Sequence, residues 1–135
     1  MVAVLGFSKE EIRAAVTDMY TVVAEKPETP LHFPIGSEAC LLAGYSQAQI
    51  ENLPPAALES FAGVGCPFRA EIIKPGQTVL DVGSGSGTDV IIASRLVGPE
   101  DKVYALDFTP AMRDKLETTL AGAGIGNVEI VSGDA

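Results

Sequence analysis

Apolar positions recur with a helical period through the first part of the chain, up to about residue 75. After a capping box formed by Ser8 and Glu11, apolar side chains return every three to four residues as far as Glu25. Shorter helices are predicted over residues 37–43 and from Pro55 to Phe61, with prolines and glycines between them. We therefore expect residues 1–75 to form an all-helical cap.

Residues 76–135 have a different pattern, in which β-branched runs alternate with stretches of helical spacing. The predicted strands cover residues 78–82, 102–107 and 128–131, and the predicted helices cover residues 88–97 and 110–121, the second capped by Thr109. The β-α-β-α-β order is typical of an α/β fold whose parallel strands are joined by right-handed crossovers.

The composition excludes several classes of protein. A hydrophobic content of 47% with 20% charged residues is typical of a globular chain, not a disordered one. The net charge of −9 opposes binding to nucleic acid. No apolar run approaches the roughly 20 residues that cross a bilayer, and residues 1–7 lack the basic start of a leader, so a cytoplasmic protein is predicted. Cys40 and Cys66 have no CxxC spacing, and we expect neither a disulfide framework nor a metal site.

A glycine-rich loop lies between the first predicted strand and the following helix. It contains Gly83, Gly85 and Gly87, and glycine allows both a sharp turn and close approach of a ligand to the backbone. The GxGxG spacing differs from the GxGxxG fingerprint of dinucleotide sites, so a ligand without phosphates is favoured over a nicotinamide cofactor. The alternative is a flexible loop without a ligand.

Asp107 ends the second predicted strand, about 20 residues past the glycine loop. An acidic side chain at this position can accept both hydroxyl hydrogens of a ribose. The alternative is that Asp107 only fixes the turn at Thr109 and Pro110.

Three ordered segments of the chain resemble a known family. They are Val79-Leu80-Asp81-Val82-Gly83-Ser84-Gly85-Ser86-Gly87, Val103-Tyr104-Ala105-Leu106-Asp107-Phe108-Thr109-Pro110-Ala111-Met112, and Ser132-Gly133-Asp134-Ala135. Together they resemble the class I S-adenosylmethionine-dependent methyltransferases, which have a Rossmann-like sheet. With the segments at residues 32–36 and 61–68, the chain is most similar to the arsenite-methyltransferase-like (methyltransferase type 11) group.

The resemblance implies S-adenosylmethionine as cofactor and assigns its methionine part to the glycine loop. Gly83, Ser84, Gly85 and Gly87 would lie against this part, and Asp81 would take the amino group through water.

The resemblance assigns the adenosine part to the second and third strand ends. Asp107 would hold the ribose, Phe108 and Met112 would enclose the adenine, and Asp134 would accept from its amino group. The alternatives are core packing for Phe108 and Met112, and a solvated side chain for Asp134.

The cysteines depart from the arsenic-binding pattern of the resembling group. The family's cysteine falls on Val64, whereas this chain has Cys66, two positions later. Cys66 is a candidate metalloid ligand because thiolates suit soft metalloids, and a buried, unreactive thiol is the alternative. No catalytic residue is assigned.

The resembling fold continues past a third strand and has its first strand at the centre. We therefore expect the strand order 3-2-1 and only the first part of the cofactor domain. The outer edge of the first strand would then be bare, and we expect it to pair with a second copy or with a separate second half. The function predicted is methyl transfer to a small molecule, arsenite being one candidate, with residues 1–75 as substrate lid. The alternative function is a non-catalytic module that binds an adenosyl ligand or a protein.

Overall fold

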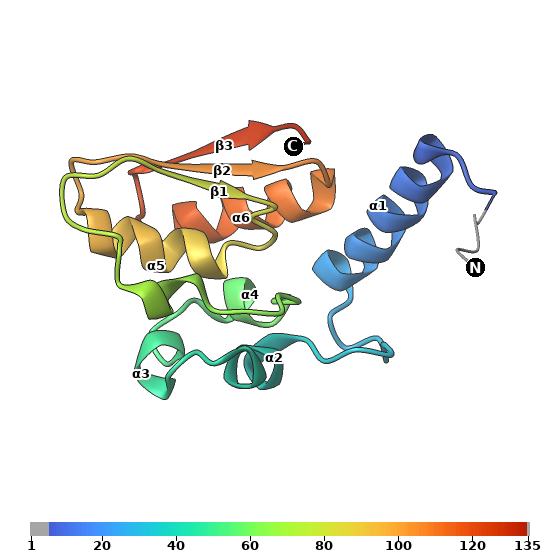
Figure 1. Ribbon diagram of the computed structural model, residues 1–135, viewed down its shortest axis with the longest axis horizontal. Helices are drawn as coiled ribbons and strands as arrows, with labels where there is room; N and C mark the ends of the chain where they lie inside the picture. The colour runs from blue at the N-terminus through green and yellow to red at the C-terminus, as the bar shows by residue number, and fades with distance from the viewer. Residues whose placement is uncertain (1–5, 135) are drawn as a thin grey trace.

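The computed structural model describes residues 6–134. Within these residues, three parallel strands form one sheet (Figure 1). Strands β1 (Val79–Val82) and β3 (Val128–Ser132) flank β2 (Val103–Asp107). Both pairings are parallel. The α/β class and the predicted strand order are confirmed. Residues 1–5 and Ala135 lie outside the described residues, and residues 1–5 include most of the segment that was compared with a leader.

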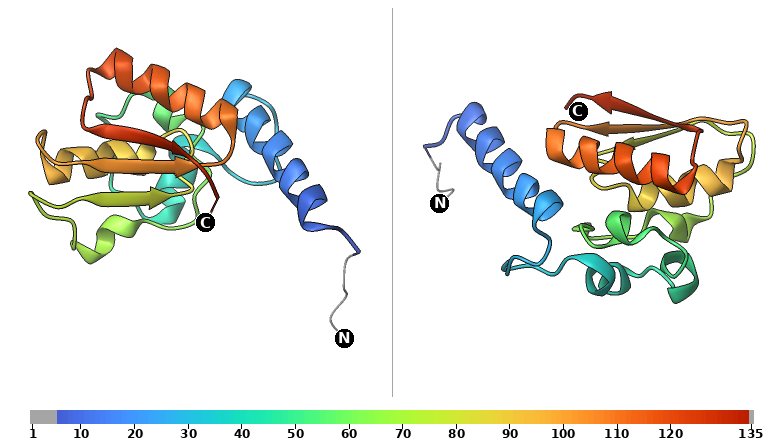
Figure 2. Two further views of the ribbon diagram at one scale, coloured as in Figure 1. Left: turned by 90° about the horizontal axis from the view of Figure 1, so that it is seen from above. Right: turned by 180° about the vertical axis from the view of Figure 1, so that it is seen from behind.

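Two helices cover one face of the sheet, as the views in Figures 1 and 2 show. They are α5 (Thr88–Val97) and α6 (Pro110–Ala123), which fill the intervals between the strands. Their buried side chains meet those of β2 in the main core, where Ile91, Val103 and Leu116 are fully buried. On the opposite face, Leu80 and Val82 of β1 remain exposed.

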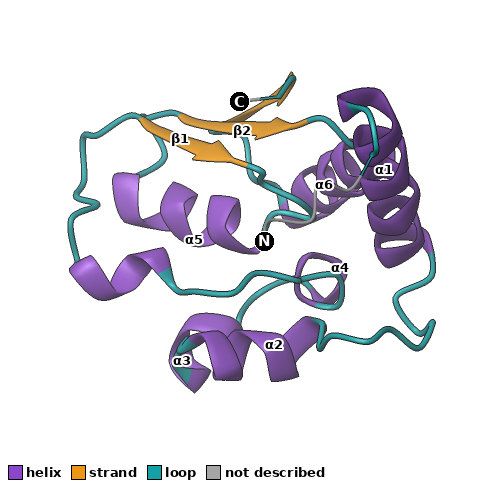
Figure 3. Cartoon of the chain, turned by 45° about the vertical axis from the view of Figure 1, so that its right-hand side comes forward, coloured by secondary structure: helices purple, strands orange, loops and turns teal. Residues whose placement is uncertain are grey.

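The helical cap consists of short helices that pack below the α5–α6 layer and one long helix beside it. Helix α1 (Lys9–Glu25) lies next to α6 at the end of the sheet where the strands terminate (Figures 1 and 3). Its predicted capping box is present, because Glu11 N donates to Ser8 Oγ. The other cap elements are α2 (Gly36–Ala43), α3 (Gln47–Ile50), α4 (Pro55–Leu58) and the 3₁₀ helix η1 (Pro67–Ala70).

The structure differs from the sequence prediction at a few element ends. Helix α4 ends at Leu58 and not at Phe61, because the Ala57 carbonyl, which would accept the N–H of Phe61 in a longer helix, instead accepts the hydroxyls of Ser86 and Thr88. Thr109 occupies the N-cap position of α6, but its side chain makes no capping hydrogen bond. Helix η1 was not predicted. Among the helices of residues 6–134, none combines the length and apolar character needed to cross a membrane.

Leu116 should be a main determinant of stability, because its side chain is fully buried between α6 and the start of α5. We expect Leu116→Ala to lower the free energy of unfolding by about 3 kcal/mol, from lost burial and the cavity left behind. Leu42→Ala, at a leucine that is 72% exposed, should change it by less than about 0.5 kcal/mol. Urea unfolding followed by circular dichroism measures both; similar effects of the two substitutions would contradict this packing.

Candidate functional site

The glycine loop leaves the end of β1 as the sequence predicts, and neighbouring backbone groups hold it. Gly83 N and Ser84 N both donate to the carbonyl of Leu106, the last apolar residue of β2, at 2.8 and 3.0 Å. Gly83, Gly85 and Gly87 all have positive φ, between 55° and 98°, which other residues adopt only with strain. The sequence needs glycine here because the chain must turn sharply between β1 and α5.

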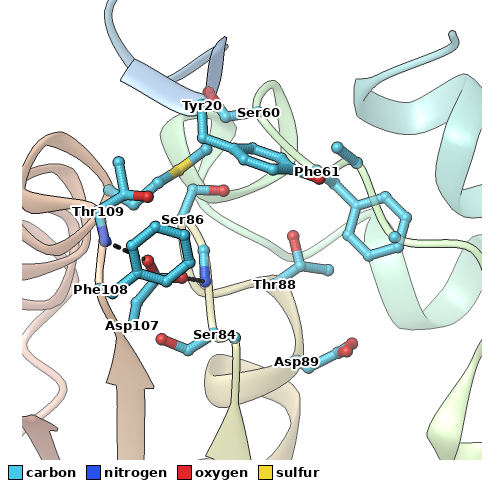
Figure 4. A pocket seen from close by; sticks show the side chains of 15 residues that line it. Tyr20, Ser60, Phe61, Ser84, Ser86, Thr88, Asp89, Asp107, Phe108 and Thr109 are labelled. Atoms are coloured by element: carbon cyan, nitrogen blue, oxygen red, sulfur yellow. Dashed lines mark hydrogen bonds between the residues drawn. The ribbon is translucent and has the colours of Figure 1, made fainter. Parts of the chain in front are cut away.

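Asp107 joins the glycine loop to the next strand end (Figure 4). Its Oδ2 accepts the N–H of Gly85 and its Oδ1 accepts the N–H of Thr109, each at 2.8 Å. The alternative role of fixing the turn at Thr109 therefore accounts for one of its two oxygens. Because each carboxylate oxygen has two acceptor positions, one position on each oxygen remains for another donor.

A cavity of about 280 Å³ opens in front of this loop, close to the lower end of the ~300–1,000 Å³ range of small-molecule pockets. Three parts of the chain wall it. They are the loop and the start of α5, the segment that follows β2, and the stretch from Ser60 to Gly63 in the cap, with Tyr20 of α1 completing the wall (Figure 4).

Six of the nine residues predicted for the site line this cavity: Gly83, Ser84, Gly85, Asp107, Phe108 and Met112. Phe108 is half-buried, whereas Met112 is 2% exposed and also packs against Val23 and Ala24 of α1. Met112 therefore belongs to the core and to the cavity wall at the same time.

The other three predicted residues, Asp81, Gly87 and Asp134, do not line the cavity. Gly87 lies behind it, where a Cβ would overlap Cδ1 of Leu116. Its absence of a side chain thus serves packing of α6 against the loop. Asp134 faces α1, and its Oδ2 lies 3.2 Å from a guanidinium nitrogen of Arg13.

Several cavity residues were missed by the sequence analysis. Ser86 belongs to the loop and Thr88 begins α5. Their hydroxyls donate to the carbonyl of Ala57 in α4 at 2.6 and 2.9 Å, which ties the loop and the start of α5 to the cap. Tyr20 fits the helical spacing of the apolar positions in α1, and no local signal distinguishes it from a core residue. The remaining missed residues are Ser60, Phe61, Ala62, Gly63, Asp89 and Thr109.

Asp89 is the second carboxylate in the cavity wall, and it has a buried partner. The hydroxyl of Tyr45, which is 3% exposed, donates to Asp89 Oδ1. Burial raises the pKa of Asp89, although the hydrogen bond from Tyr45 acts in the opposite direction. Burial and the Asp89 contact raise the pKa of the Tyr45 phenol well above its usual range, so this hydroxyl stays protonated.

Asp81 lies on β1 behind the loop, and few favourable interactions offset the burial of its negative charge. Burial, followed by the charges of Asp89 and Asp107, raises its pKa to about 6. Its Oδ2 and the Oγ of Ser84 are buried side-chain atoms that have no hydrogen-bond partner among the described residues. One of these two unpartnered atoms, Ser84 Oγ, belongs to a residue that lines the cavity, and the other, Asp81 Oδ2, lies behind the loop.

The cysteines do not assemble a metal site in the part of the chain that the structure describes. Cys40 is fully buried in the main core, and burial raises the pKa of its thiol to about 12. Cys66 is half-buried and does not line the cavity. Within residues 6–134, no group of three or more His, Cys, Asp or Glu side chains is placed to hold a metal ion.

Comparison with protein families identifies the chain. The family described as Protein-L-isoaspartate(D-aspartate) O-methyltransferase (PCMT) matches residues 64–135, more than half of the chain. The chain belongs to the PCMT family. The expected class, the class I S-adenosylmethionine-dependent methyltransferases, is thereby confirmed.

Relatives of this PCMT-family chain carry two different names. An arsenite methyltransferase of Halobacterium salinarum is 40% identical over 74 residues, which cover 53% of this chain and 19% of the relative. A protein-L-isoaspartate O-methyltransferase of Methanococcus maripaludis is 33% identical and covers 78% of this chain and 63% of the relative. The chain thus spans less than two thirds of either relative. Its similarity to arsenite methyltransferases stands beside a similarity to protein-L-isoaspartate O-methyltransferases.

A solved structure supports the same fold. An arsenic (III) S-adenosylmethionine methyltransferase from Chlamydomonas reinhardtii is 30% identical, with a TM-score of 0.55. The match covers 65% of this chain and 31% of that one. The Rossmann-like arrangement expected from the sequence is therefore confirmed by a known methyltransferase.

The half-buried Asp81 should make the stability of this PCMT-family chain depend on pH. Its folded pKa of about 6 exceeds the ordinary value of 3.8, so the folded chain binds more protons between these pH values, and stability falls as the pH rises through them. We expect Asp81→Asn to raise the free energy of unfolding at pH 7 by on the order of 2–3 kcal/mol, with little difference at pH 4.

Urea unfolding at both pH values measures the effect of Asp81→Asn. The matched control is Asp114→Asn, at an exposed carboxylate of α6, which should shift stability by less than about 0.5 kcal/mol at either pH. A stability difference for Asp81→Asn that is the same at pH 4 and pH 7 would contradict the assignment.

Proposed function

We propose that this chain forms the cofactor-binding part of an S-adenosylmethionine-dependent methyltransferase that acts on a small-molecule acceptor. The observation that carries the proposal is the junction of the glycine loop with Asp107 at the floor of a cavity, in a chain of the PCMT family. Bound there, the cofactor would supply a methyl group on a positively charged sulfur. The chain contributes the position and orientation of the two reactants.

The loop fits a ligand that lies directly on its backbone. Cβ atoms built on Gly83 and Gly85 meet nothing within 4 Å, so the space in front of both residues is open. S-Adenosylmethionine has no phosphate, which agrees with the GxGxG spacing and with a loop that is tied to Asp107 instead of opening its N–H groups to an anion.

The adenosine part fits the end of β2 in this proposal. The free acceptor positions on the Asp107 carboxylate would take the two ribose hydroxyls. Phe108 and Met112 line the cavity next to Asp107, and an aromatic ring and a polarizable thioether suit a flat heterocycle.

The methionine part fits the acidic base of the site. Its amino group is a cationic donor, and the unpartnered Ser84 Oγ lies in a residue that lines the cavity, while Asp81, behind the loop, adds a carboxylate that a water could connect to the amino group. Asp89 adds a third nearby carboxylate, and its charge favours a ligand with a positive amino group and a positive sulfur. Gly87 supports this end of the site only through packing.

The cap fits a role as substrate lid. Tyr20 and the stretch from Ser60 to Gly63 wall the cavity opposite the glycine loop, so residues 1–75 would meet the acceptor while residues 76–135 hold the cofactor. Strand β1 pairs only with β2 among the described residues, and we propose that its other edge receives a further strand from a second half or a second copy.

A second candidate acceptor is an isoaspartyl peptide. The observation that favours it is the family match over residues 64–135, together with the named relatives of that activity. Arsenite is favoured by the relative from Halobacterium salinarum and by the solved structure from Chlamydomonas reinhardtii, and Cys66 is the remaining candidate ligand for it.

Binding of S-adenosylhomocysteine, measured by titration calorimetry, tests the cofactor site. We expect Gly85→Ala to weaken binding at least about tenfold, because the added methyl group enters the open space of the cavity. Gly76→Ala is the matched control: Gly76 also has positive φ and open space at its Cβ, but it lies away from the cavity, so affinity should not change. Absence of wild-type binding at millimolar ligand would refute the cofactor site.

Transfer of a labelled methyl group from S-adenosylmethionine distinguishes the acceptors. We expect label to reach a small molecule such as arsenite and not an isoaspartyl peptide, when both are offered to protein that contains this chain. Label in the peptide alone would replace the small-molecule acceptor with the second candidate and would leave the cofactor site unaffected.

A further inference from the structure

Tyr45 and Asp89 form a hydrogen-bonded pair at the wall of the cavity. Asp89 is the second residue of α5 and lines the cavity, whereas Tyr45 follows α2, is 3% exposed and does not line it. The hydroxyl of Tyr45 donates to Asp89 Oδ1. This hydrogen bond uses one of the two carboxylate oxygens, so the other oxygen can accept from a ligand.

Two aromatic rings hold the side chain of Tyr45 in place. The centre of the Tyr45 ring lies 5.3 Å from that of Phe61 and 6.2 Å from that of Phe68, in an edge-to-face arrangement with each. All three rings belong to the main core. The hydroxyl therefore reaches Asp89 from a closely packed part of the molecule and fixes the direction of the carboxylate.

Asp89 and Asp107 lie on opposite sides of the glycine loop. In Figure 4, Asp107 lies on one side of Ser84 and Asp89 lies on the other. The proposed function places the adenosine part of the cofactor at Asp107 and Phe108. A cofactor that extends from there across the loop brings its methionine part to Asp89.

Ser84 supplies a second observation that indicates a polar ligand group at this end of the cavity. It lines the cavity and is 8% exposed, and its Oγ has no hydrogen-bond partner among the described residues. A buried hydroxyl without a partner is costly, so a ligand group that pairs with it is expected. An ammonium group has three donors and can serve both this hydroxyl and the carboxylate of Asp89.

The charge of Asp89 suits contact with a cation. Burial raises its pKa, and the hydrogen bond from Tyr45 lowers it and thus favours the ionised carboxylate. The other carboxylates near the loop are less suited to direct contact. Asp107 already accepts two backbone N–H groups, and Asp81 does not line the cavity.

We propose that Asp89 binds the amino group of the methionine part directly, and that Tyr45 is a positioning residue that holds the Asp89 carboxylate in place. This inference rests on the proposed function, which puts the amino group at the acidic base of the site without naming its direct partner. Asp81 keeps the water-mediated role.

Two ligands that differ in one group test the role of Asp89. S-Adenosylhomocysteine has the amino group, whereas its deamino analogue keeps the adenosine, the sulfur and the carboxylate. We expect Asp89→Asn to weaken binding of S-adenosylhomocysteine at least about tenfold, and to change that of the analogue by less than about twofold, in titration calorimetry. Asp114→Asn, at an exposed carboxylate of α6, removes the same charge and should change neither affinity.

Tyr45→Phe tests the positioning role, because it removes the hydroxyl and keeps the ring in the core. We expect S-adenosylhomocysteine to bind roughly threefold more weakly and the deamino analogue to bind as before. Added to Asp89→Asn, Tyr45→Phe should cost no further affinity, because both substitutions act through one contact. Tyr104→Phe, at a tyrosine of β2 that does not line the cavity, is the matched control and should leave both affinities unchanged.

The ratio of the two affinities separates a binding role from a structural one. If Asp89 only supports the fold, Asp89→Asn weakens both ligands by the same factor or neither, and either result overturns the inference. A wild-type ratio in Tyr45→Phe overturns the role of Tyr45, and Asp89→Asn decides the role of Asp89 even if Tyr45→Phe folds poorly. Absence of wild-type binding to both ligands at millimolar concentration would instead refute the proposed function.

Discussion

The geometry of the site depends on the carboxylate of Asp107. This side chain is 8% exposed, and both its oxygens accept backbone N–H groups, one from the glycine loop and one from the turn before α6. A buried carboxylate without partners would be costly, so these hydrogen bonds stabilise the side chain as well as the loop. Because β1 and β2 are held in register by the sheet, the position of Asp107 also fixes the position of Gly85.

The local elements of this chain could be predicted because each has a local physical cause. Capping boxes, proline at the first helical position and β-branched runs act within a few residues. The end of α4 was less certain, since long-range hydrogen bonds act there: the hydroxyls of Ser86 and Thr88 donate to the Ala57 carbonyl. Local rules do not contain these partners.

The same distinction explains the candidate site. Gly83, Gly85 and Asp107 were predictable because parallel strands bring their carboxyl ends to one edge of the sheet. Tyr20 was not predictable, since its place in the cavity depends on how α1 packs against α6, and only tertiary contacts decide that. Gly87 and Asp134 were predicted for the site because their residue types suit a ligand. In the structure Gly87 packs against Leu116, and Asp134 pairs with Arg13.

The acidic base of the site links stability to function. Asp81, Asp89 and Asp107 lie close enough for the charges of the other two to raise the pKa of Asp81, so the free protein keeps like charges together in a poorly hydrated place. A fold selected for stability alone would replace Asp81 with a neutral side chain. The proposed cofactor carries positive charge on both its amino group and its sulfur, and would offset the repulsion when it binds. Part of the binding free energy would then come from relief of the repulsion among these three carboxylates that the folded chain already contains.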